Sequence, residues 1–316
     1  MLYPLKFIPL FFPKIWGGKK IKKIFLNAEN FENIGEAWTL SAVEGSETVA
    51  ESGFLAENNL AELSEVYLGN LLGDAVFEQY GSDFPLLVKV IDAAENLSIQ
   101  VHPNDELAAE RHNTFGKNEM WYMLDCEPEA HIIAGFNRKI SEKEYLRAVK
   151  NNVLEDYLKK IPVKKGDAVF IPAGCVHSIG KGCTLLEIQQ SSDITYRIYD
   201  YNRVDKNGKK RELHTDFAID AIDFDNWENS LLKTKNSVIK NEFFTAKILD
   251  FNQKIELDLS EIDSFVLLCA VEKSFVCVYK NENFYVNYGE TLLIPAEINC
   301  VALIPSTSAK ILEVFI

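Results

Sequence analysis

A twelve-residue pattern that occurs twice constrains the fold of this chain more than any other feature. Residues 166–177 read Gly, five residues, Pro, one residue, Gly, two residues, His, and residues 289–300 align with them without gaps. In the first copy this order predicts a tight turn at Gly166, a strand over 168–171 and a second turn at 172–174. The repeat therefore predicts two similar barrels of short strands.

A candidate metal site involves the first copy. Residues 97–102 alternate as in a strand, so Ser98, Gln100 and His102 project from one face. Glu119 and His177 would complete a set of two imidazoles, a carboxylate and an amide oxygen. Such a set suits a borderline ion such as zinc and leaves a position open for substrate or water. A lone His in a strand is more often structural, but the pattern ending at His177 favours ligation.

Composition excludes several classes of function. The chain has 316 residues, 47% of them hydrophobic, which suits one large or two small domains with real cores. Its formal net charge of −14 argues against nucleic acid, so the expected partners are small molecules. No run approaches the ~20 apolar residues of a membrane span.

The N-terminus and the cysteines indicate the compartment. The apolar opening is interrupted by Lys6, Pro13 and Lys14, and no small-residue cleavage site follows, so we predict a cytoplasmic protein. The six cysteines contain no C-x-x-C pair, which favours buried free thiols over disulfides or a thiolate metal site.

Helices are few in the expected structure. The clearest begins after Ser141, where the spacing to Glu144 predicts a capping box and apolar residues follow on one face as far as Leu158. We expect this helix to cover a barrel. Weaker helical patterns occupy residues 59–72 and 216–224.

The repeat also predicts the domains. We expect a metal-bearing domain with covering helices over residues 1–235 and a degenerate β domain over 236–316, with a break in the polar, Lys-rich stretch 229–241. Cys300 stands where His177 stands in the first copy, so we expect the second barrel to bind no metal and to have a structural role.

The pattern ending at His177 matches a motif of the cupin superfamily, and the whole chain resembles the short bacterial form of the type I phosphomannose isomerases. The resemblance implies an all-β fold of two cupin barrels, that is, double-stranded β-helix or jelly-roll barrels, with a few added helices. It also implies interconversion of mannose 6-phosphate and fructose 6-phosphate. The segments that carry it are residues 15–18, 35–38, 97–103, 116–121, 166–177 and 190–197.

The resemblance assigns roles to individual residues. One zinc ion would be held by Gln100, His102, Glu119 and His177. Arg197, in a Ser-Asp-x-Thr-x-Arg pattern, would stabilise negative charge on an enediolate. The remaining assignments are Lys117 or Glu187 for proton transfer, and Lys89, Ser98 and Arg203 for the substrate phosphate.

Several alternatives remain open. Arg197 could instead form a surface ion pair with Asp193 or Asp200, and Glu187 could only orient a neighbouring group. The whole chain could be an iron-dependent cupin oxygenase, a sugar-binding protein without activity, or an isomerase of another phosphosugar. His112, His131 and His214 receive no role, although residues 211–214 also resemble the family. The oligomeric state cannot be predicted from the sequence.

Overall fold

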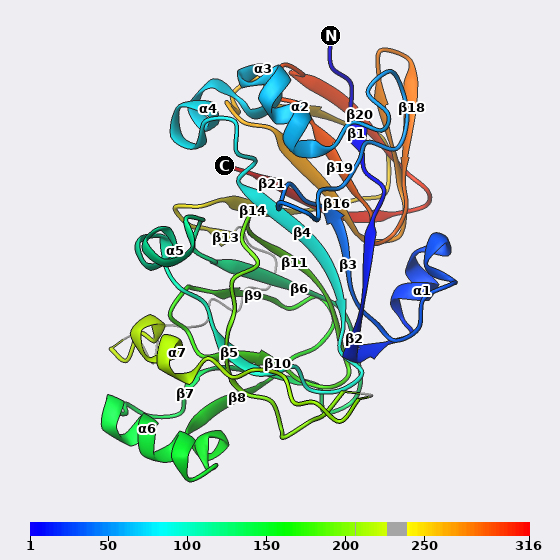
Figure 1. Cartoon of the computed structure of the whole chain (residues 1–316). Helices are drawn as coiled ribbons and strands as arrows, with labels where there is room; N and C mark the ends of the chain where they lie inside the picture. The colour runs from blue at the N-terminus through cyan, green and yellow to red at the C-terminus, as the bar shows by residue number, and fades with distance from the viewer. Residues whose placement is uncertain (206, 226–238) are drawn as a thin grey trace. The chain divides into compact units, whose positions relative to one another are not determined.

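The computed structural model describes residues 1–205, 207–225 and 239–316. The chain forms two compact units. Unit 1 contains Met1–Leu10, Ala37–Val90 and Asn236–Ile316, and unit 2 contains Phe11–Glu36 and Ile91–Lys235. Strands dominate both units, so the predicted all-β class is confirmed (Figure 1).

Unit 2 contains two sheets and the helices around them. One sheet has the order β12-β5-β10-β7-β8 and the other β2-β3-β4-β11-β6-β9, of which β3 and β4 continue into unit 1. The strands are β2 (Leu10–Gly18), β3 (Ile34–Leu40), β4 (Leu86–Asp92), β5 (Ile99–Val101), β6 (Glu119–Cys126), β7 (His131–Phe136), β8 (Leu158–Pro162), β9 (Ala168–Ile171), β10 (His177–Ile179), β11 (Cys183–Gln190) and β12 (Tyr196–Tyr199). The helices are α1 (Ile21–Ile24), α5 (Asp105–His112), α6 (Glu142–Lys150), α7 (Thr215–Ala221) and the 3₁₀ helices η1 (Leu26–Ala28) and η2 (Leu154–Tyr157).

Alternation along the strands gives the β5 sheet two distinct faces. On β7, Ile132 and Ala134 join one core cluster with Trp121 of β6, whereas Ile133 joins another with Tyr145 of α6. Residues 99, 101, 196 and 198 also belong to this second cluster, together with Ala218 of α7. Because successive side chains point to opposite faces, Gln100 and Arg197 project away from the helices and toward the barrel interior.

The helices largely follow the predictions, with shorter bounds. Ser141 caps α6 through the predicted capping box with Glu144, and α6 packs on the barrel, but it ends at Lys150 and does not reach Leu158. The helical pattern at 216–224 corresponds to α7.

Unit 1 is a second β sandwich with helices of its own. Its sheets have the orders β1-β19-β16-β21-β14-β13 and β15-β20-β17-β18, and they share one apolar core. The strands are β1 (Leu5–Lys6), β13 (Ile239–Lys240), β14 (Thr245–Phe251), β15 (Ile255–Asp258), β16 (Val266–Glu272), β17 (Phe275–Tyr279), β18 (Glu282–Val286), β19 (Thr291–Ile294), β20 (Cys300–Pro305) and β21 (Ala309–Phe315). The predicted helix over 59–72 is two helices, α2 (Leu60–Tyr67) and α3 (Gly69–Leu72), followed by α4 (Asp74–Tyr80).

The repeated pattern has the same local structure in both units. Gly166 and Gly289 have φ angles of 85° and 86°, a region that favours glycine, and the strands β9 and β19 follow them. The final residues of the two copies, His177 and Cys300, begin β10 and β20. His177 is buried whereas Cys300 is exposed, so the two copies differ at this position in environment as well as in residue type.

The two compact units do not coincide with the predicted domains. The apolar core shared by the two sheets of unit 1 is built from residues between 249 and 315, but Leu5 pairs with Leu293 and thereby adds the N-terminal segment to this unit. The break predicted over 229–241 lies mostly outside the described residues. The assignment of residues 1–235 and 236–316 to separate domains stays a prediction.

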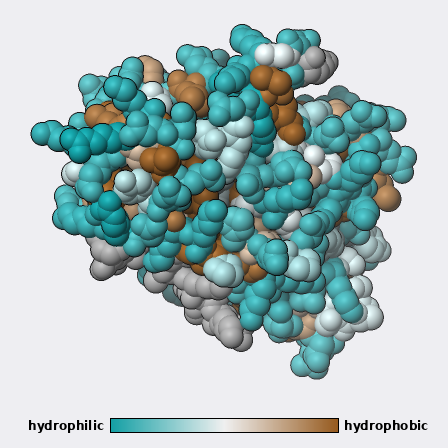
Figure 2. All heavy atoms as spheres, turned by 90° about the horizontal axis from the view of Figure 1, so that it is seen from below, coloured by the Kyte–Doolittle hydropathy of each residue, from teal (hydrophilic) through white to brown (hydrophobic). Residues whose placement is uncertain are grey.

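The surface and the cysteines agree with the composition. Hydrophilic side chains cover most of the face in Figure 2, with smaller apolar patches between them. All six cysteines are free, as predicted, and four are buried. Among the described residues, no helix combines the length and apolar character needed to cross a bilayer.

Candidate metal centre and active site

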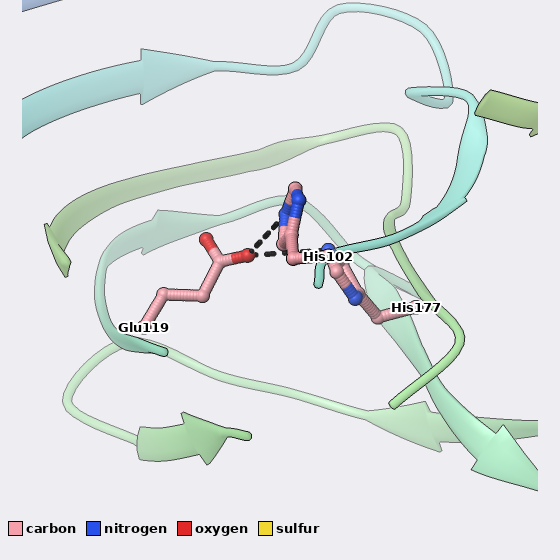
Figure 3. A group of neighbouring side chains, drawn as sticks. All are labelled: His102, Glu119 and His177. Atoms are coloured by element: carbon pink, nitrogen blue, oxygen red, sulfur yellow. Dashed lines mark ion pairs between the residues drawn. The ribbon is translucent and has the colours of Figure 1, made fainter. Parts of the chain in front are cut away.

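Three buried side chains converge inside unit 2 (Figure 3). Glu119 Oε1, at the start of β6, lies 2.8 Å from His102 Nε2 and 3.2 Å from His177 Nε2. His102 directly follows β5, and His177 begins β10. The sheets on either side of the barrel thus contribute to one cluster, as the sequence predicted for these three residues.

Main-chain carbonyls set the orientation of both imidazoles. His102 Nδ1 donates to the Ile194 carbonyl at 2.9 Å, and His177 Nδ1 donates to the Cys175 carbonyl at 2.8 Å. In the neutral rings, Nε2 therefore carries a lone pair directed into the cluster. Burial and the neighbouring Lys117 charge lower the pKa of His102 to about 3, so this ring is neutral at pH 7.

The Glu119 oxygen that faces the two imidazole rings has no hydrogen-bond donor among the described residues. Glu119 Oε1 is buried and has no hydrogen-bond partner among the described residues. Burial alone would raise the pKa of Glu119, but the positive charge of Lys117, together with smaller effects of His102 and Glu187, holds the pKa well below its usual value. Two nitrogen lone pairs and a carboxylate oxygen thus converge on one point, and a metal cation satisfies all three. The cluster fits a metal site.

Register aligns two further predicted residues with His177 in one row. On adjacent strands, Arg197 pairs with Gln100 and Gln100 pairs with His177. Cross-strand partners project from the same face, so all three side chains enter the barrel from this sheet. The Gln100 amide reaches the cluster, with Nε2 3.2 Å from His177 Nε2, and its Oε1 accepts a hydrogen bond from Ser98.

Lys117 and Glu187 both border the cluster. Lys117 Nζ lies 3.1 Å from His102 Nε2 and 3.6 Å from Glu119 Oε1. Trp121 donates its indole N–H to Glu119 Oε2 at 3.1 Å and to Glu187 Oε2 at 2.8 Å. Glu187 is buried and shares the Trp121 N–H with Glu119, so the indole holds the two carboxylates next to each other.

Among the described residues, Arg197 forms no ion pair with Asp193 or Asp200, the two acidic residues considered from the sequence. Its Nη1 donates to the Glu212 carbonyl at 2.8 Å, and its Nε is buried without a hydrogen-bond partner among the described residues. Asp200 is bound by Arg203 and by Arg211. Burial, followed by the like charge of Arg211, lowers the pKa of Arg197, which still leaves an arginine cationic at neutral pH.

The predicted phosphate contacts are dispersed. Buried Ser98 contacts Gln100, next to the cluster. Arg203 donates to Asp200 and to the Asn96 carbonyl. Lys89 is buried in the part of β4 that belongs to unit 1, where its Nζ lies 4.8 Å from the centroid of the Trp38 ring.

Sequence reasoning assigned no role to the groups that support the cluster. Gln190 Oε1 accepts from both the main-chain and side-chain nitrogens of Asn118, and Gln190 Nε2 donates to Asp105. Trp121 bridges the two carboxylates. Its position two residues after Glu119 in a strand was the available signal, because residues i and i+2 share a face.

Comparisons with known proteins agree with this geometry. A family model described as the catalytic domain of type I phosphomannose isomerase matches residues 5–143. A putative mannose-6-phosphate isomerase of Bacillus subtilis, YvyI, is 33% identical over 307 residues, covering 93% of both chains. The mannose-6-phosphate isomerase ManA of the same organism is 40% identical over 224 residues, covering 70% of this chain and 68% of its own.

Solved structures extend the likeness to the fold. The crystal structure of mannose 6-phosphate isomerase from Bacillus subtilis superposes with a TM-score of 0.88 at 30% identity, over 99% of each chain. A putative mannosephosphate isomerase from Archaeoglobus fulgidus has a TM-score of 0.81 at 22% identity, over 99% of this chain and 98% of its own, which supports the fold alone. With relatives matched over nearly its full length, the chain belongs to the type I phosphomannose isomerase family.

Proposed function

We propose that the chain is a zinc-dependent isomerase that interconverts mannose 6-phosphate and fructose 6-phosphate. The observation that carries the proposal is the convergence of His102 Nε2, His177 Nε2 and Glu119 Oε1 in a buried site. Gln100 is the proposed fourth ligand, through its amide oxygen. This requires exchanging the two amide atoms, because Nε2 now faces His177.

The reaction moves a proton between C1 and C2 of the sugar and therefore develops negative charge on two oxygens. A bound zinc ion supplies Lewis-acid stabilisation of that charge. Arg197 is the proposed second stabiliser, because it enters from the same sheet face as Gln100 and keeps a buried Nε–H without a protein acceptor among the described residues.

Proton transfer is proposed for Lys117 or Glu187. Both are buried at the cluster, and they differ in their neighbours. Glu187 accepts from Trp121, which also donates to Glu119, and this favours a supporting role, whereas Lys117 Nζ faces the ligand atoms themselves. Solvent-hydrogen exchange at C2 separates these roles. Substitution of the true base would abolish this exchange. Substitution of a group that only supports the cluster would retain the exchange and lower the affinity for the metal.

We also propose Ser98, Arg203 and Lys89 as contacts for the substrate phosphate. Ser98 adjoins Gln100, and Arg203 carries a guanidinium of the kind that binds phosphate, which would have to exchange its present bonds to Asp200 and the Asn96 carbonyl for the substrate. A cytoplasmic location is supported by the six free cysteines, since reducing compartments preserve thiols.

The test is formation of fructose 6-phosphate from mannose 6-phosphate by purified protein. Activity should disappear on chelation and return with zinc. Activity that persists in protein shown by elemental analysis to be metal-free would contradict the zinc requirement. Inactive, folded, zinc-loaded protein would contradict the substrate and would justify trying other phosphosugars or iron with oxygen.

A further inference from the structure

Residues 211–214 lie directly against strand β12. His214 Nδ1 accepts a hydrogen bond from the Arg197 main-chain N–H at 3.1 Å, and the His214 N–H donates to the Arg197 carbonyl at 2.7 Å. An imidazole thus takes the place of the main-chain carbonyl that would complete an antiparallel pair. Both polar main-chain groups of Arg197 are held by this one residue.

The same segment also holds the Arg197 side chain. The Glu212 carbonyl accepts from Nη1 at 2.8 Å, while Nε has no partner among the described residues. An arginine side chain loses considerable rotamer freedom when it is fixed. Fixing its main chain and one guanidinium nitrogen in advance removes part of this loss from the reaction and leaves other donors available.

We propose that His214 is a positioning residue, which fixes Arg197 at the edge of the row formed with Gln100 and His177. This inference rests on the charge-stabilising role proposed above for Arg197. His214 makes no hydrogen bond to the metal cluster among the described residues, so its effect is exerted through Arg197.

The protonation state of His214 supports this arrangement. Nδ1 can accept a hydrogen bond only while it is unprotonated, so the neutral ring must carry its proton on Nε2. Burial and the positive charge of Arg197 lower the pKa of His214, and Glu212 opposes them. The acceptor is therefore available at neutral pH.

Two substitutions separate the acceptor from the volume of the ring. Asn places Oδ1 on Cγ, where His carries Nδ1, so His214→Asn retains an acceptor. His214→Leu places a methyl group there and removes it. We expect His214→Leu to lower kcat about 10- to 100-fold with KM changed less than about threefold, and His214→Asn to retain most of the rate. His131→Leu, on strand β7, is the matched control, because His131 Nδ1 contacts the nearby Glu129 carbonyl and makes no hydrogen bond to Arg197 among the described residues.

A second readout does not depend on activity. The Arg197 Nε–H signal in ¹⁵N–¹H NMR spectra, assigned by its loss in Arg197→Lys, should show an ordered side chain in the wild type and in His214→Asn. In His214→Leu it should show increased ps–ns motion, with zinc content unchanged. Unchanged order and unchanged kcat in His214→Leu would overturn the proposal. If the wild type has no isomerase activity, the proposed function fails, and the NMR comparison still decides whether His214 fixes Arg197.

Discussion

At the scale of single residues, the candidate metal centre depends on two histidine nitrogens that carry no proton. His102 and His177 each donate Nδ1–H to a main-chain carbonyl, which leaves Nε2 of both rings directed at Glu119. A carboxylate that faces two lone pairs is unfavourable without a cation. In the polypeptide alone the three groups therefore form a cation-binding site and do not stabilise one another. Lys117 supplies one positive charge at 3.6 Å from Glu119 and offsets part of this cost.

Arg197→Ala is expected to separate metal binding from catalysis. Arg197 lies on β12, two strands from His177, and its side chain makes no hydrogen bond to the three cluster residues in the part of the chain that the structure describes. Removal of its charge should lower kcat about 100-fold or more while bound zinc stays at the wild-type level. Steady-state kinetics together with elemental analysis would check this. A variant that loses zinc in proportion to activity would show that Arg197 supports the metal instead.

Trp121→Phe is expected to weaken metal binding. The substitution keeps one buried aromatic ring and removes the five-membered ring whose N–H bridges Glu119 and Glu187, so the two carboxyl groups lose their shared donor. Loss of such a supporting hydrogen bond reduces metal affinity by about 10- to 100-fold. Zinc affinity is measured by competition with a chromogenic chelator. Wild-type affinity in Trp121→Phe would mean that Glu119 is oriented by its other neighbours.

Asp200→Asn tests an ion-pair network next to Arg197. Burial would raise the pKa of Asp200, but hydrogen bonds from Arg211 and Arg203 hold it below its ordinary value. A depressed folded-state pKa stabilises the protein above the unfolded-state value, near 4, and this stabilisation is lost as pH falls through the folded-state pKa. We expect Asp200→Asn to cost about 1–2 kcal/mol at pH 7, discounted for the partly exposed arginines, and progressively less below about pH 4. Urea unfolding of the wild type and the variant, at pH 7 and below about pH 4, measures the difference in the free energy of unfolding. A difference that does not change with pH would exclude an ionic origin.

At the scale of elements, local signals predicted the presence of segments better than their length. The capping box at Ser141 correctly placed the start of α6, but the apolar pattern continued past its end at Lys150, because the following residues pack as η2 and β8 instead. The pattern over 59–72 did not reveal the break at Leu68, whose φ of 46° lies in the left-handed region. Apolar spacing reports which side is buried, and it does not report where the backbone turns.

The cap of α6 gives a prediction at this scale. Ser141 Oγ accepts from the Glu144 N–H at 3.3 Å, and Glu144 Oε2 accepts from the Ser141 N–H at 2.9 Å. Ser141→Ala removes the first bond and should lower the free energy of unfolding by about 1 kcal/mol without changing kcat, since α6 packs outside the barrel. Glu142→Ala, in the same turn but outside the capping box, is the control. Equal losses in the two variants would indicate a general effect of the first turn.

At the scale of the whole molecule, the sequence predicted the class of fold and the three cluster residues, because the repeated pattern and the strand alternation are local signals. It could not predict that Leu5 pairs with Leu293, since no local pattern reports a partner so distant in the chain. It also left residues 211–214 unexplained, because a His side chain that replaces a main-chain acceptor has no sequence signature. Strand register in the folded sheet supplied the row ending at His177, and the hydrogen bonds of the folded chain supplied the contact of His214 with Arg197.

Zinc is expected to protect one part of the molecule from hydrogen exchange. All proposed ligands lie in unit 2, on or next to β5, β6 and β10, so openings that separate these strands must release the ion. A ligand present at 1,000 times its dissociation constant stabilises the bound state by about 4.1 kcal/mol, which slows exchange through such openings by up to about 1,000-fold. Amides of β16 and β21 belong to unit 1 and should exchange at unchanged rates wherever that unit opens alone. Mass spectrometry of the chelated and zinc-loaded protein measures both sets at once. Equal slowing in the two units would mean that they open together, whereas no slowing in β5, β6 and β10 would contradict the proposed ligands.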